Sequence, residues 1–175
     1  MYTNLLFYIC SALNRHQIAY MLTGSVAMNM YLVPRSTLDI DIEVMPEQIA
    51  VFLSLFDSDF YINHETVKAE LQHRGVGMFN VIDHNTNYKI DFIVRKNTKY
   101  ETEKFNNRRT LSLAGMNVTV CSPEDLIISK LQWIQILQSE RQMNDIRNLL
   151  QLKDIDMQYI KNWISKLNLT TFNIV

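Results

Sequence analysis

The sequence lacks several features that would mark its class at once. It has only two cysteines, Cys10 and Cys121, without CxxC spacing and without a cluster of histidines nearby. That pattern excludes the common zinc sites and thiol–disulfide motifs. Its net charge of −1 at pH 7 provides no global field that would draw the chain to nucleic acid or to a membrane.

Long apolar runs, internal repeats and low-complexity segments are also missing. No run approaches the length that a membrane-spanning helix needs. The first residues alternate polar and apolar types without a cationic lead, so we expect no signal peptide and a soluble, cytoplasmic protein. With 175 residues, of which 47% are hydrophobic, the chain can form one domain with a substantial core.

The most informative segment that is present is Asp39-Ile40-Asp41-Ile42. In a strand, side chains at i and i+2 point to the same side, so the two aspartates share one face and the isoleucines share the other. Adjacent carboxylates repel each other unless a cation lies between them, and a hard divalent cation is the natural choice. Glu43 continues this face as a candidate ligand, although solvation at the strand end is the simpler expectation. Acids on an ordinary surface strand would produce the same pattern.

A small pair, Gly24-Ser25, precedes the first aspartate by fourteen residues, at the point where a short strand is expected to turn into a helix. Glycine allows a phosphate to approach the backbone, and the first N–H groups of a helix favour an anion. Ser25 can cap that helix or donate its hydroxyl to the same phosphate. An ordinary strand–helix turn with a serine cap fits this pair as well.

A third carboxylate, Asp91, lies in the alternating segment 88–94, where it shares a face with Lys89. If this strand pairs beside the first acidic strand, Asp91 joins Asp39 and Asp41. Three carboxylates could then hold one or two Mg²⁺ ions, which would activate an attacking oxygen and neutralise a leaving pyrophosphate.

The overall pattern predicts an α/β (α+β) fold, a small mixed sheet flanked by helices, with a core at 1–121 and a helical subdomain at 122–175. We expect strands at 18–22 and 38–44 and hairpins at 77–82/88–94 and 110–113/118–121. We expect helices at 3–16, at 25–32 and after Pro46. In the C-terminal part, Ser122 and Pro123 predict a helix start, with helices at 123–138, 141–151 and 156–167.

Several residues admit two interpretations. The stretch 89–109 has seven basic and three acidic residues, which would suit an anionic ligand but is more typical of a solvated loop. Tyr100 and Phe105 within it could stack on a base, although a loop anchor is simpler. Trp133 and Trp163 have apolar neighbours at helical spacing, which predicts core packing. The four histidines, His16, His64, His73 and His84, are expected at the surface.

These motifs together resemble the nucleotidyltransferase superfamily, with its polymerase-beta-like fold. The resemblance covers about residues 18–150 and rests on Leu22-Thr23-Gly24-Ser25, the acid pair and the later Lys-Ile-Asp strand. Pro34-Arg35-Ser36-Thr37, the segment 122–130 and the segment 140–147 also resemble the branch that contains AbiEii-type toxins and uncharacterised bacterial nucleotidyltransferases. The chain is shorter than typical AbiEii-type toxins.

The resemblance implies roles for nine residues. Gly24, Ser25 and Arg35 would bind the triphosphate, and Lys89 or Lys130 would contact phosphate. Asp39 and Asp41 would hold Mg²⁺ or Mn²⁺, while Asp91 would be the third ligand or the base for an incoming hydroxyl. Asp145 would orient a lysine or that base.

The function implied is metal-dependent transfer of a nucleoside monophosphate from an NTP, such as ATP, to an acceptor hydroxyl or phosphate, with release of pyrophosphate. The acceptor could be tRNA, a small molecule or a protein. The alternatives are a non-catalytic nucleotide-, RNA- or partner-binding module of a toxin–antitoxin system and, more weakly, a purely structural domain. The intact acid pair argues against a binding relic, because adjacent carboxylates oppose phosphate binding unless a cation neutralises them.

Overall fold

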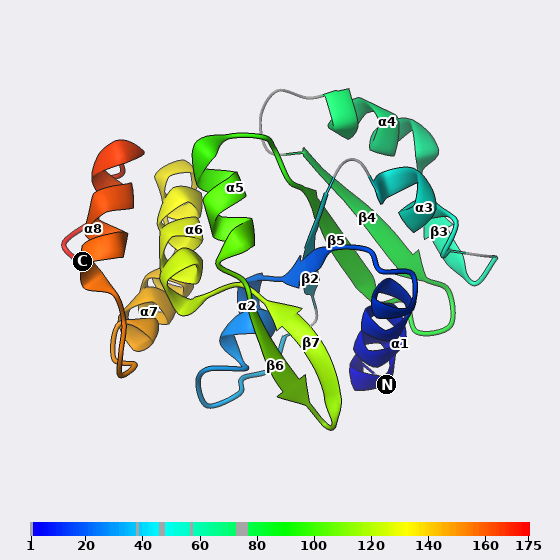
Figure 1. Cartoon of the computed structure of the whole chain (residues 1–175), viewed down its shortest axis with the longest axis horizontal. Helices are drawn as coiled ribbons and strands as arrows, with labels where there is room; N and C mark the ends of the chain where they lie inside the picture. Colours follow the sequence, from blue (N-terminus) through cyan, green and yellow to red (C-terminus); the bar gives the residue numbers. More distant parts are fainter. Residues whose placement is uncertain (1, 38, 46–47, 57, 73–76) are drawn as a thin grey trace.

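The chain folds around a mixed sheet of seven strands in the order β3-β4-β5-β2-β1-β7-β6 (Figure 1). The structure is a computed structural model that describes residues 2–37, 39–45, 48–56, 58–72 and 77–175. The strands are β1 (Tyr20–Leu22), β2 (Ile40–Val44), β3 (Phe60–Ile62), β4 (Gly77–Asp83), β5 (Lys89–Val94), β6 (Arg109–Leu113) and β7 (Met116–Val120). The helices are α1 (Tyr2–Arg15), α2 (Gly24–Met28), α3 (Ile49–Leu53), α4 (His64–Gln72), α5 (Lys99–Asn106), α6 (Pro123–Ile136), α7 (Glu140–Leu149) and α8 (Met157–Lys166).

The centre of the sheet brings together the segments that carry the sequence motifs. β2 pairs antiparallel with β1 and parallel with β5, and β1 also pairs parallel with β7. Both predicted hairpins form, as β4–β5 and as β6–β7. The Lys-Ile-Asp strand therefore lies directly beside the acidic strand, and the mixed α/β class expected from the sequence is confirmed.

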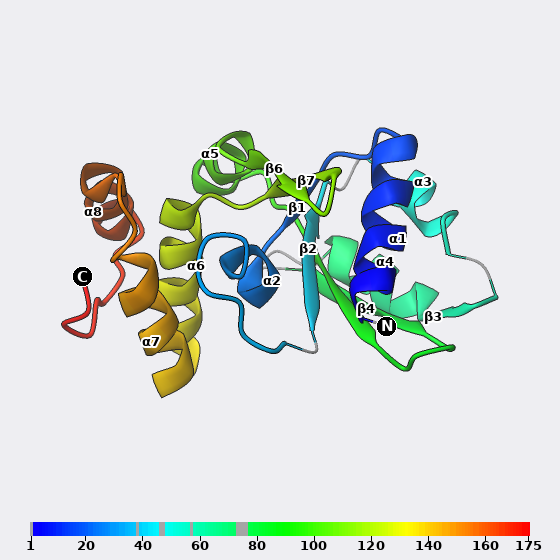
Figure 2. The same cartoon turned by 90° about the horizontal axis from the view of Figure 1, so that it is seen from below.

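The apolar face of β2 forms the main core. Ile40, Ile42 and Val44 are fully buried, and Ile42 lies opposite Phe92 of β5. The ring of Phe52 on α3 packs 4.3 Å from that of Phe92, centroid to centroid. Figure 2 shows α1 and α3 on this side of the sheet. Each fully buried side chain of this size stabilises the fold by roughly 1.5–3 kcal/mol.

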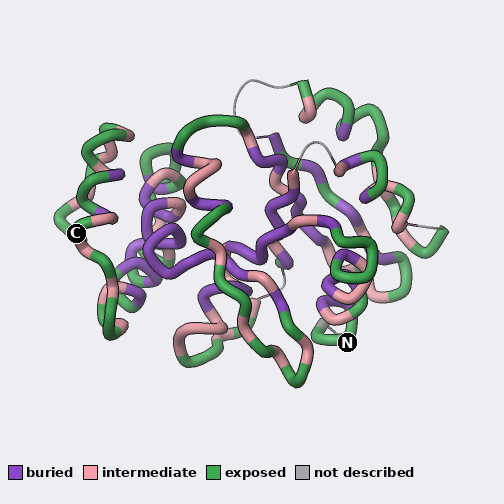
Figure 3. Tube along the Cα trace, viewed as in Figure 1, coloured by how far each residue is buried: buried purple, intermediate pink, exposed green. Residues whose placement is uncertain are grey.

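The opposite face of the sheet, which carries the acids, is covered by α2 and α6 (Figure 2). α6 is the most enclosed helix: its trace is largely buried in Figure 3, and its buried residues include Leu126, Ile127, Ile128 and Leu131. The short helix α2 places Val26, Ala27 and Met28 in the same core.

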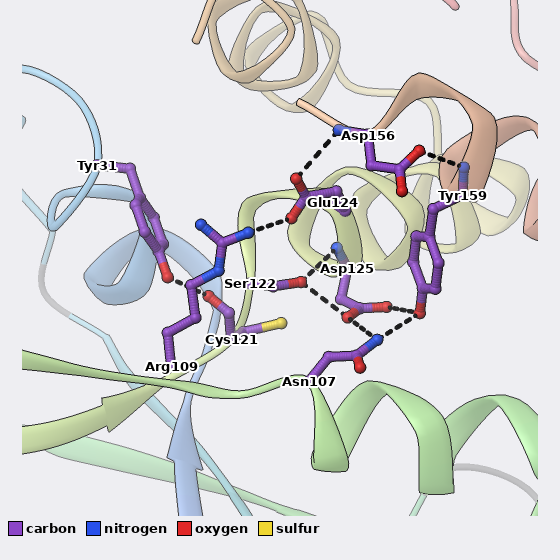
Figure 4. Close-up of polar contacts among 9 residues, drawn as sticks. All are labelled: Tyr31, Asn107, Arg109, Cys121, Ser122, Glu124, Asp125, Asp156 and Tyr159. Carbon is purple, nitrogen blue, oxygen red and sulfur yellow. Dashed lines mark hydrogen bonds and ion pairs between the residues drawn. The ribbon is translucent and has the colours of Figure 1, made fainter. Parts of the chain in front are cut away.

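The start of α6 ties the C-terminal helices to the sheet (Figure 4). Ser122 caps the helix as predicted, accepting a hydrogen bond from the backbone N–H of Asp125 at 3.1 Å. The carboxylate of Asp125 accepts from the hydroxyl of Tyr159 on α8 at 2.8 Å. Glu124 forms an ion pair with Arg109 of β6 at 2.9 Å. These contacts join α8, α6 and β6, and a division of the chain at residues 121 and 122 stays a prediction.

Several element predictions need correction. The helix after β1 begins at Gly24 rather than after a Ser25 cap, and it ends at Met28 rather than at residue 32. The helix expected after Pro46 is α3, and Pro46 itself lies outside the described residues, as does His73. Three elements were not predicted, β3, α4 and α5. The helices α6, α7 and α8 lie within two residues of their predicted bounds.

Candidate active site

The glycine turn and the acid pair are in direct contact. Gly24 has φ +59°, and a Cβ built on it would lie only 2.1 Å from Oδ2 of Asp41. The backbone N–H of Thr23 donates to the carbonyl of Asp41 at 2.9 Å. Antiparallel pairing of β1 with β2 produces this contact, because Leu22 lies opposite Ile42. Glycine is therefore required here both for its conformation and for the space that the carboxylate occupies.

The three predicted carboxylates lie on one face of two neighbouring strands. Asp41 and Asp91 are register partners in the parallel pair β2–β5, and Asp39 immediately precedes β2. The side chain of Asp39 is 60% exposed and that of Asp91 only 9%. Burial, followed by repulsion from Asp91 and Asp39, raises the pKa of Asp41 to about 6, although Lys130 and Lys89 oppose this shift.

Asp91 already has two partners. Its Oδ2 lies 2.7 Å from Nζ of Lys89, and its Oδ1 accepts a hydrogen bond from the amide of Asn80. Lys89 also lies 3.9 Å from Oδ1 of Asp39, so its ammonium sits between two acids rather than apart from them. The hydrogen bond to Asp91 raises the pKa of Lys89 above its ordinary value. Asn80 was not singled out from the sequence, although it is the residue opposite Asp91 in the predicted hairpin.

A second polar group links α6 and α7 to the glycine turn. Oδ2 of Asp145 accepts from Nζ of Lys130 and from Nη2 of Arg35, each at 2.8 Å. The same Nη2 donates to Oγ of Ser25 at 2.8 Å, and Lys130 also donates to Oε1 of Gln142 at 2.8 Å. Asp145 thus bonds to both cations, and the role that the resemblance implies for it, to orient a lysine or the base, stays a prediction.

The lysine and the aspartate of this second group are buried, and burial changes the pKa of the lysine. Lys130 and Asp145 are 5% and 4% exposed. Burial lowers the pKa of Lys130, although the carboxylate of Asp145 opposes the shift. Nε and Nη1 of Arg35 are buried without a hydrogen-bond partner among the described residues. Such donors are costly to leave unpaired, which makes this guanidinium a candidate for an anionic ligand after a small movement.

A cleft of about 420 Å³ connects the two groups. It is lined from β1–α2, β2, β4, β5, α6 and the start of α7, and it contains seven of the nine predicted residues: Gly24, Ser25, Arg35, Asp39, Asp41, Asp91 and Lys130. Lys89 and Asp145 do not line the cleft but contact residues that do. A larger cavity of about 590 Å³ lies beside α1, but the described residues that line it include no carboxylate.

The carboxylates have the chemistry of a site for a hard cation. All their ligand atoms are oxygens. Repulsion from Asp91 and Asp39 adds to the effect of burial on the pKa of Asp41, and a divalent cation would neutralise the charge that causes this repulsion. Across the ranges that the structure describes, no three acid, histidine or cysteine side chains are gathered closely enough to hold an ion. Lys89 and Asn80 contact the two oxygens of Asp91.

Two predicted surroundings of the site are wrong. Glu43 is not solvated: it is 1% exposed, and its carboxylate lies 2.7 Å from Nζ of Lys104. The basic stretch is not an open loop, because residues 99–106 form α5 and Lys104, Tyr100 and Phe105 are buried. Asp91 and Ile93 of this stretch line the cleft, but none of its basic residues does.

The two tryptophans differ from each other. Trp163 is buried as predicted, 3% exposed. Trp133, expected in the core, is 45% exposed and lines the cleft together with Met78 and Arg141. Helical spacing could not reveal this, because a helix face that borders a cleft has the same apolar periodicity as one that borders a core. His16, His64 and His84 are exposed as expected.

Solved nucleotidyltransferase structures share this fold. The chain is similar to ANT(2'')-Ia in complex with adenylyl-2''-tobramycin, with a TM-score of 0.67, 13% identity and coverage of 94% of this chain and 95% of that one. A putative nucleotidyltransferase from Thermotoga maritima, TM1012, has a TM-score of 0.57, 17% identity and coverage of 94% and 93%. The lincosamide antibiotic adenylyltransferase LnuA has a TM-score of 0.55 and 15% identity, with coverage of 83% of this chain and 94% of that one. At such identities the likeness establishes the fold, which is that of a nucleotidyltransferase.

The sequence itself gives the family. A family model described as nucleotidyltransferase of unknown function (DUF6036) matches residues 6–173, and the chain belongs to that family. No curated protein matches the sequence. The family does not single out the AbiEii-type branch, so that finer resemblance stays a hypothesis. No helix in the described ranges has the length and apolar character needed to cross a membrane.

Proposed function

We propose that this protein transfers a nucleoside monophosphate from an NTP to an acceptor hydroxyl, releasing pyrophosphate. One observation carries the proposal: the carboxylate of Asp41 lies against the Cα of Gly24. A phosphate held at the glycine turn is thereby placed beside a cluster of acids, in which burial first and repulsion second raise the pKa of Asp41. Such a cluster would repel phosphate unless a divalent cation lay between them.

In this proposal the two polar groups have separate roles. Gly24, Ser25 and Arg35 bind the triphosphate, and Arg35 has buried donors to offer it. Asp39 and Asp41 would hold Mg²⁺ or Mn²⁺. Bound there, the cation would supply Lewis acidity toward the α-phosphate and would neutralise charge on the leaving group. Asp145 is a positioning residue, because it holds Lys130 and Arg35 rather than the reacting atoms.

The reaction follows from these roles. The oxygen of the acceptor hydroxyl attacks the α-phosphorus and forms a new P–O bond. The bond between the α-phosphorus and the oxygen that bridges to the β-phosphate breaks, and pyrophosphate leaves with that electron pair. The proton of the hydroxyl passes to Asp91, if this residue serves as the base, and Lys130 and Arg35 stabilise charge on the phosphates.

The acceptor class is open among tRNA, a small molecule and a protein. Two neighbours have names that refer to small antibiotics, the adenylyl-2''-tobramycin complex and the lincosamide adenylyltransferase. Their fold favours a small acceptor here, and the cleft of about 420 Å³ lies within the usual range of volumes for sites that bind a small molecule such as an NTP.

The second candidate is a partner-binding module of the toxin–antitoxin type. One observation favours it: Ile136 and Leu137, at the end of α6, are 79% and 76% exposed. Exposed apolar residues that are grouped can mark a contact surface. Binding of a partner there is compatible with transfer, since neither residue lines the cleft.

Thermal melting with each of the four NTPs, with and without Mg²⁺, tests the first proposal. A ligand at one hundred times its Kd stabilises the folded state by about 2.7 kcal/mol. We expect a shift that requires Mg²⁺ and that disappears in the Asp39→Asn/Asp41→Asn double variant. If millimolar nucleotide with Mg²⁺ shifts neither protein, the transferase proposal is wrong, and co-purification of a partner chain becomes the next experiment.

A further inference from the structure

The second wall of the cleft carries an exposed aromatic ring that the reaction above does not use. Trp133 lies on α6, three residues after Lys130, and both line the cleft. Residues three apart on a helix share a face and differ by about 4.5 Å along the axis. Trp133 is therefore attached to the helix about one turn after Lys130, whose ammonium bonds to Asp145.

The surroundings of Trp133 combine apolar contact with hydrogen-bonding groups. Met78 of β4 and Ile93 of β5 contribute apolar surface from the sheet side of the cleft. Arg141 and Gln142, near the start of α7, line the same cleft. Oε1 of Gln142 already accepts from Lys130, which leaves its amide as a donor toward the cleft. A flat ring with acceptors along its edge suits this combination.

The charges on this wall select among possible ligands. Lys130 and Arg141 line the cleft from α6 and α7 and are cationic, whereas Asp39, Asp41 and Asp91 line it from the sheet side. A cationic acceptor would be repelled at the Trp133 end, while an uncharged nucleobase would not. A base attached to a triphosphate at Ser25 and Arg35 would also remain within the same cleft.

We propose that Trp133 is the platform on which the nucleobase of the NTP stacks, with Met78 and Ile93 completing the apolar part of the subsite and Arg141 and Gln142 at the edge of the base. This inference rests on the proposed nucleotidyl transfer. It divides the cleft into a phosphate end at Gly24 and a base end at Trp133.

The chain contains its own probe for this proposal, because it has only two tryptophans. Trp163 does not line the cleft, and its indole N–H donates to Glu103 at 3.1 Å. We expect each NTP, added with Mg²⁺ as the non-hydrolysable α,β-methylene analogue, to quench the fluorescence of the wild type. In Trp133→Phe, only Trp163 remains, and the quench should vanish while binding persists. Inorganic tripolyphosphate, which lacks a base, should bind without quenching.

Affinity provides the second measurement. Stacking on an aromatic side chain contributes enough that Trp133→Ala should bind the analogues about 5- to 100-fold more weakly. Trp133→Phe should keep most of the affinity. Ile136→Ala is the matched control: it removes a more exposed apolar side chain from the same helix, outside the cleft lining, and should leave Kd unchanged.

Three outcomes would overturn the proposal, and they differ in what else they affect. Mg²⁺-dependent thermal shifts without a quench, and with unchanged Kd in Trp133→Ala, would remove the base subsite and leave the transferase proposal standing. An equal quench by tripolyphosphate would show that Trp133 reports on a movement of the cleft rather than on stacking. The absence of any nucleotide-induced thermal shift would remove both proposals.

Discussion

Two acids on β2, only two residues apart, have opposite relations to their surroundings. Glu43 is buried against Lys104, whose ammonium lies 2.7 Å from Glu43 and 2.6 Å from Glu101. Asp41 is surrounded mainly by like charge from Asp39 and Asp91, and within the described part of the chain it has no lysine or arginine at ion-pair distance. Both acids face the same side of the same strand.

The pKa values of both acids are raised, and the causes of the two shifts express this difference. Burial raises the pKa of Glu43 to about 7, with Lys104 acting against the shift. Burial lowers the pKa of Lys104, but Glu43 and Glu101 outweigh it and raise that pKa above its ordinary value. For Asp41, burial and the neighbouring carboxylates both raise the pKa. The carboxylate of Glu43 is paired with a lysine of the same fold and so has a structural role. The carboxylate of Asp41 lacks such a pair among the described residues, which lowers the stability of the folded protein and leaves this carboxylate able to bind a cation.

The largest expected effect is on nucleotidyl transfer, which should depend on Asp41 but not on Glu43. Asp41→Asn should lower nucleotidyl transfer by about a thousandfold, because removing a metal-ligand charge costs several kcal/mol of transition-state stabilisation. The assay is pyrophosphate release per folded molecule once an acceptor is known. Glu43→Gln is the matched control on the same strand, and it should retain transfer when the rate is normalised to the folded fraction. Equal loss in both variants would end the distinction.

The free energy of unfolding should be lowered in the opposite order, by changes to the pair formed by Glu43 and not by changes to Asp41. Lys104→Met leaves the carboxylate of Glu43 buried without its main partner, and breaking a buried pair in this way costs about 3 to 5 kcal/mol of unfolding free energy. Denaturant unfolding measures this loss. The double variant Lys104→Met/Glu43→Gln should recover part of it, because no stranded charge remains. Recovery in the double variant would be absent if Lys104 acted only through its packing against Tyr100.

The pH dependence of unfolding in EDTA sharpens the comparison further. Asp41 has a folded pKa of about 6, above its ordinary value of 3.8, so the folded state holds the proton more tightly. Stability from this group is therefore present below about pH 4 and is lost as the pH rises toward 6 and beyond.

Asp41→Asn removes this dependence and should exceed the wild type in unfolding free energy by at most about 2 to 3 kcal/mol at pH 7. The excess should shrink toward pH 4. Because Glu43 titrates with the same sign, the measurement compares the two proteins at each pH rather than one protein alone. A variant that is less stable than the wild type at pH 7 would contradict the account.

The sequence was sufficient for the part of the site that depends on local rules. Alternation along β2 and β5 predicted that Asp39, Asp41 and Asp91 would share a face, and the register confirms that Asp41 and Asp91 are neighbours. The turn at Gly24 could be predicted because few residues adopt a positive φ, although its contact with Asp41 required the pairing of β1 with β2.

The parts that sequence could not predict depend on distant partners. Nothing near Glu43 indicates Lys104, since the pair forms only when α5 docks on the sheet. The basic composition of 89–109 obscured α5, whose buried residues are few. Trp133 has a helical apolar pattern, and only the position of α6 against β4 and β5 makes its face a cleft wall.

The smallest expected effect concerns Lys89, whose ammonium already lies beside the acid cluster. The ammonium of Lys89 lies 2.7 Å from Asp91 and 3.9 Å from Asp39, so it should compete with a divalent cation in the nucleotide-free protein. Lys89→Gln should therefore bind Mn²⁺ about fivefold more tightly, a change on the scale of about 1 kcal/mol expected for a partly exposed ion pair. Titration calorimetry without nucleotide measures this.

Lys68→Gln is the control, because it removes the same charge from an equally close pair with Glu65, on α4 rather than at the acid cluster. Its Mn²⁺ affinity should equal that of the wild type. With nucleotide present, Lys89→Gln should lose its advantage if Lys89 turns to the phosphates as the cation arrives. Weaker Mn²⁺ binding in Lys89→Gln without nucleotide would mean that Lys89 orients Asp91 for the cation. The charge of the acid cluster would then be neutralised within the fold to a greater extent than the comparison with Glu43 suggests.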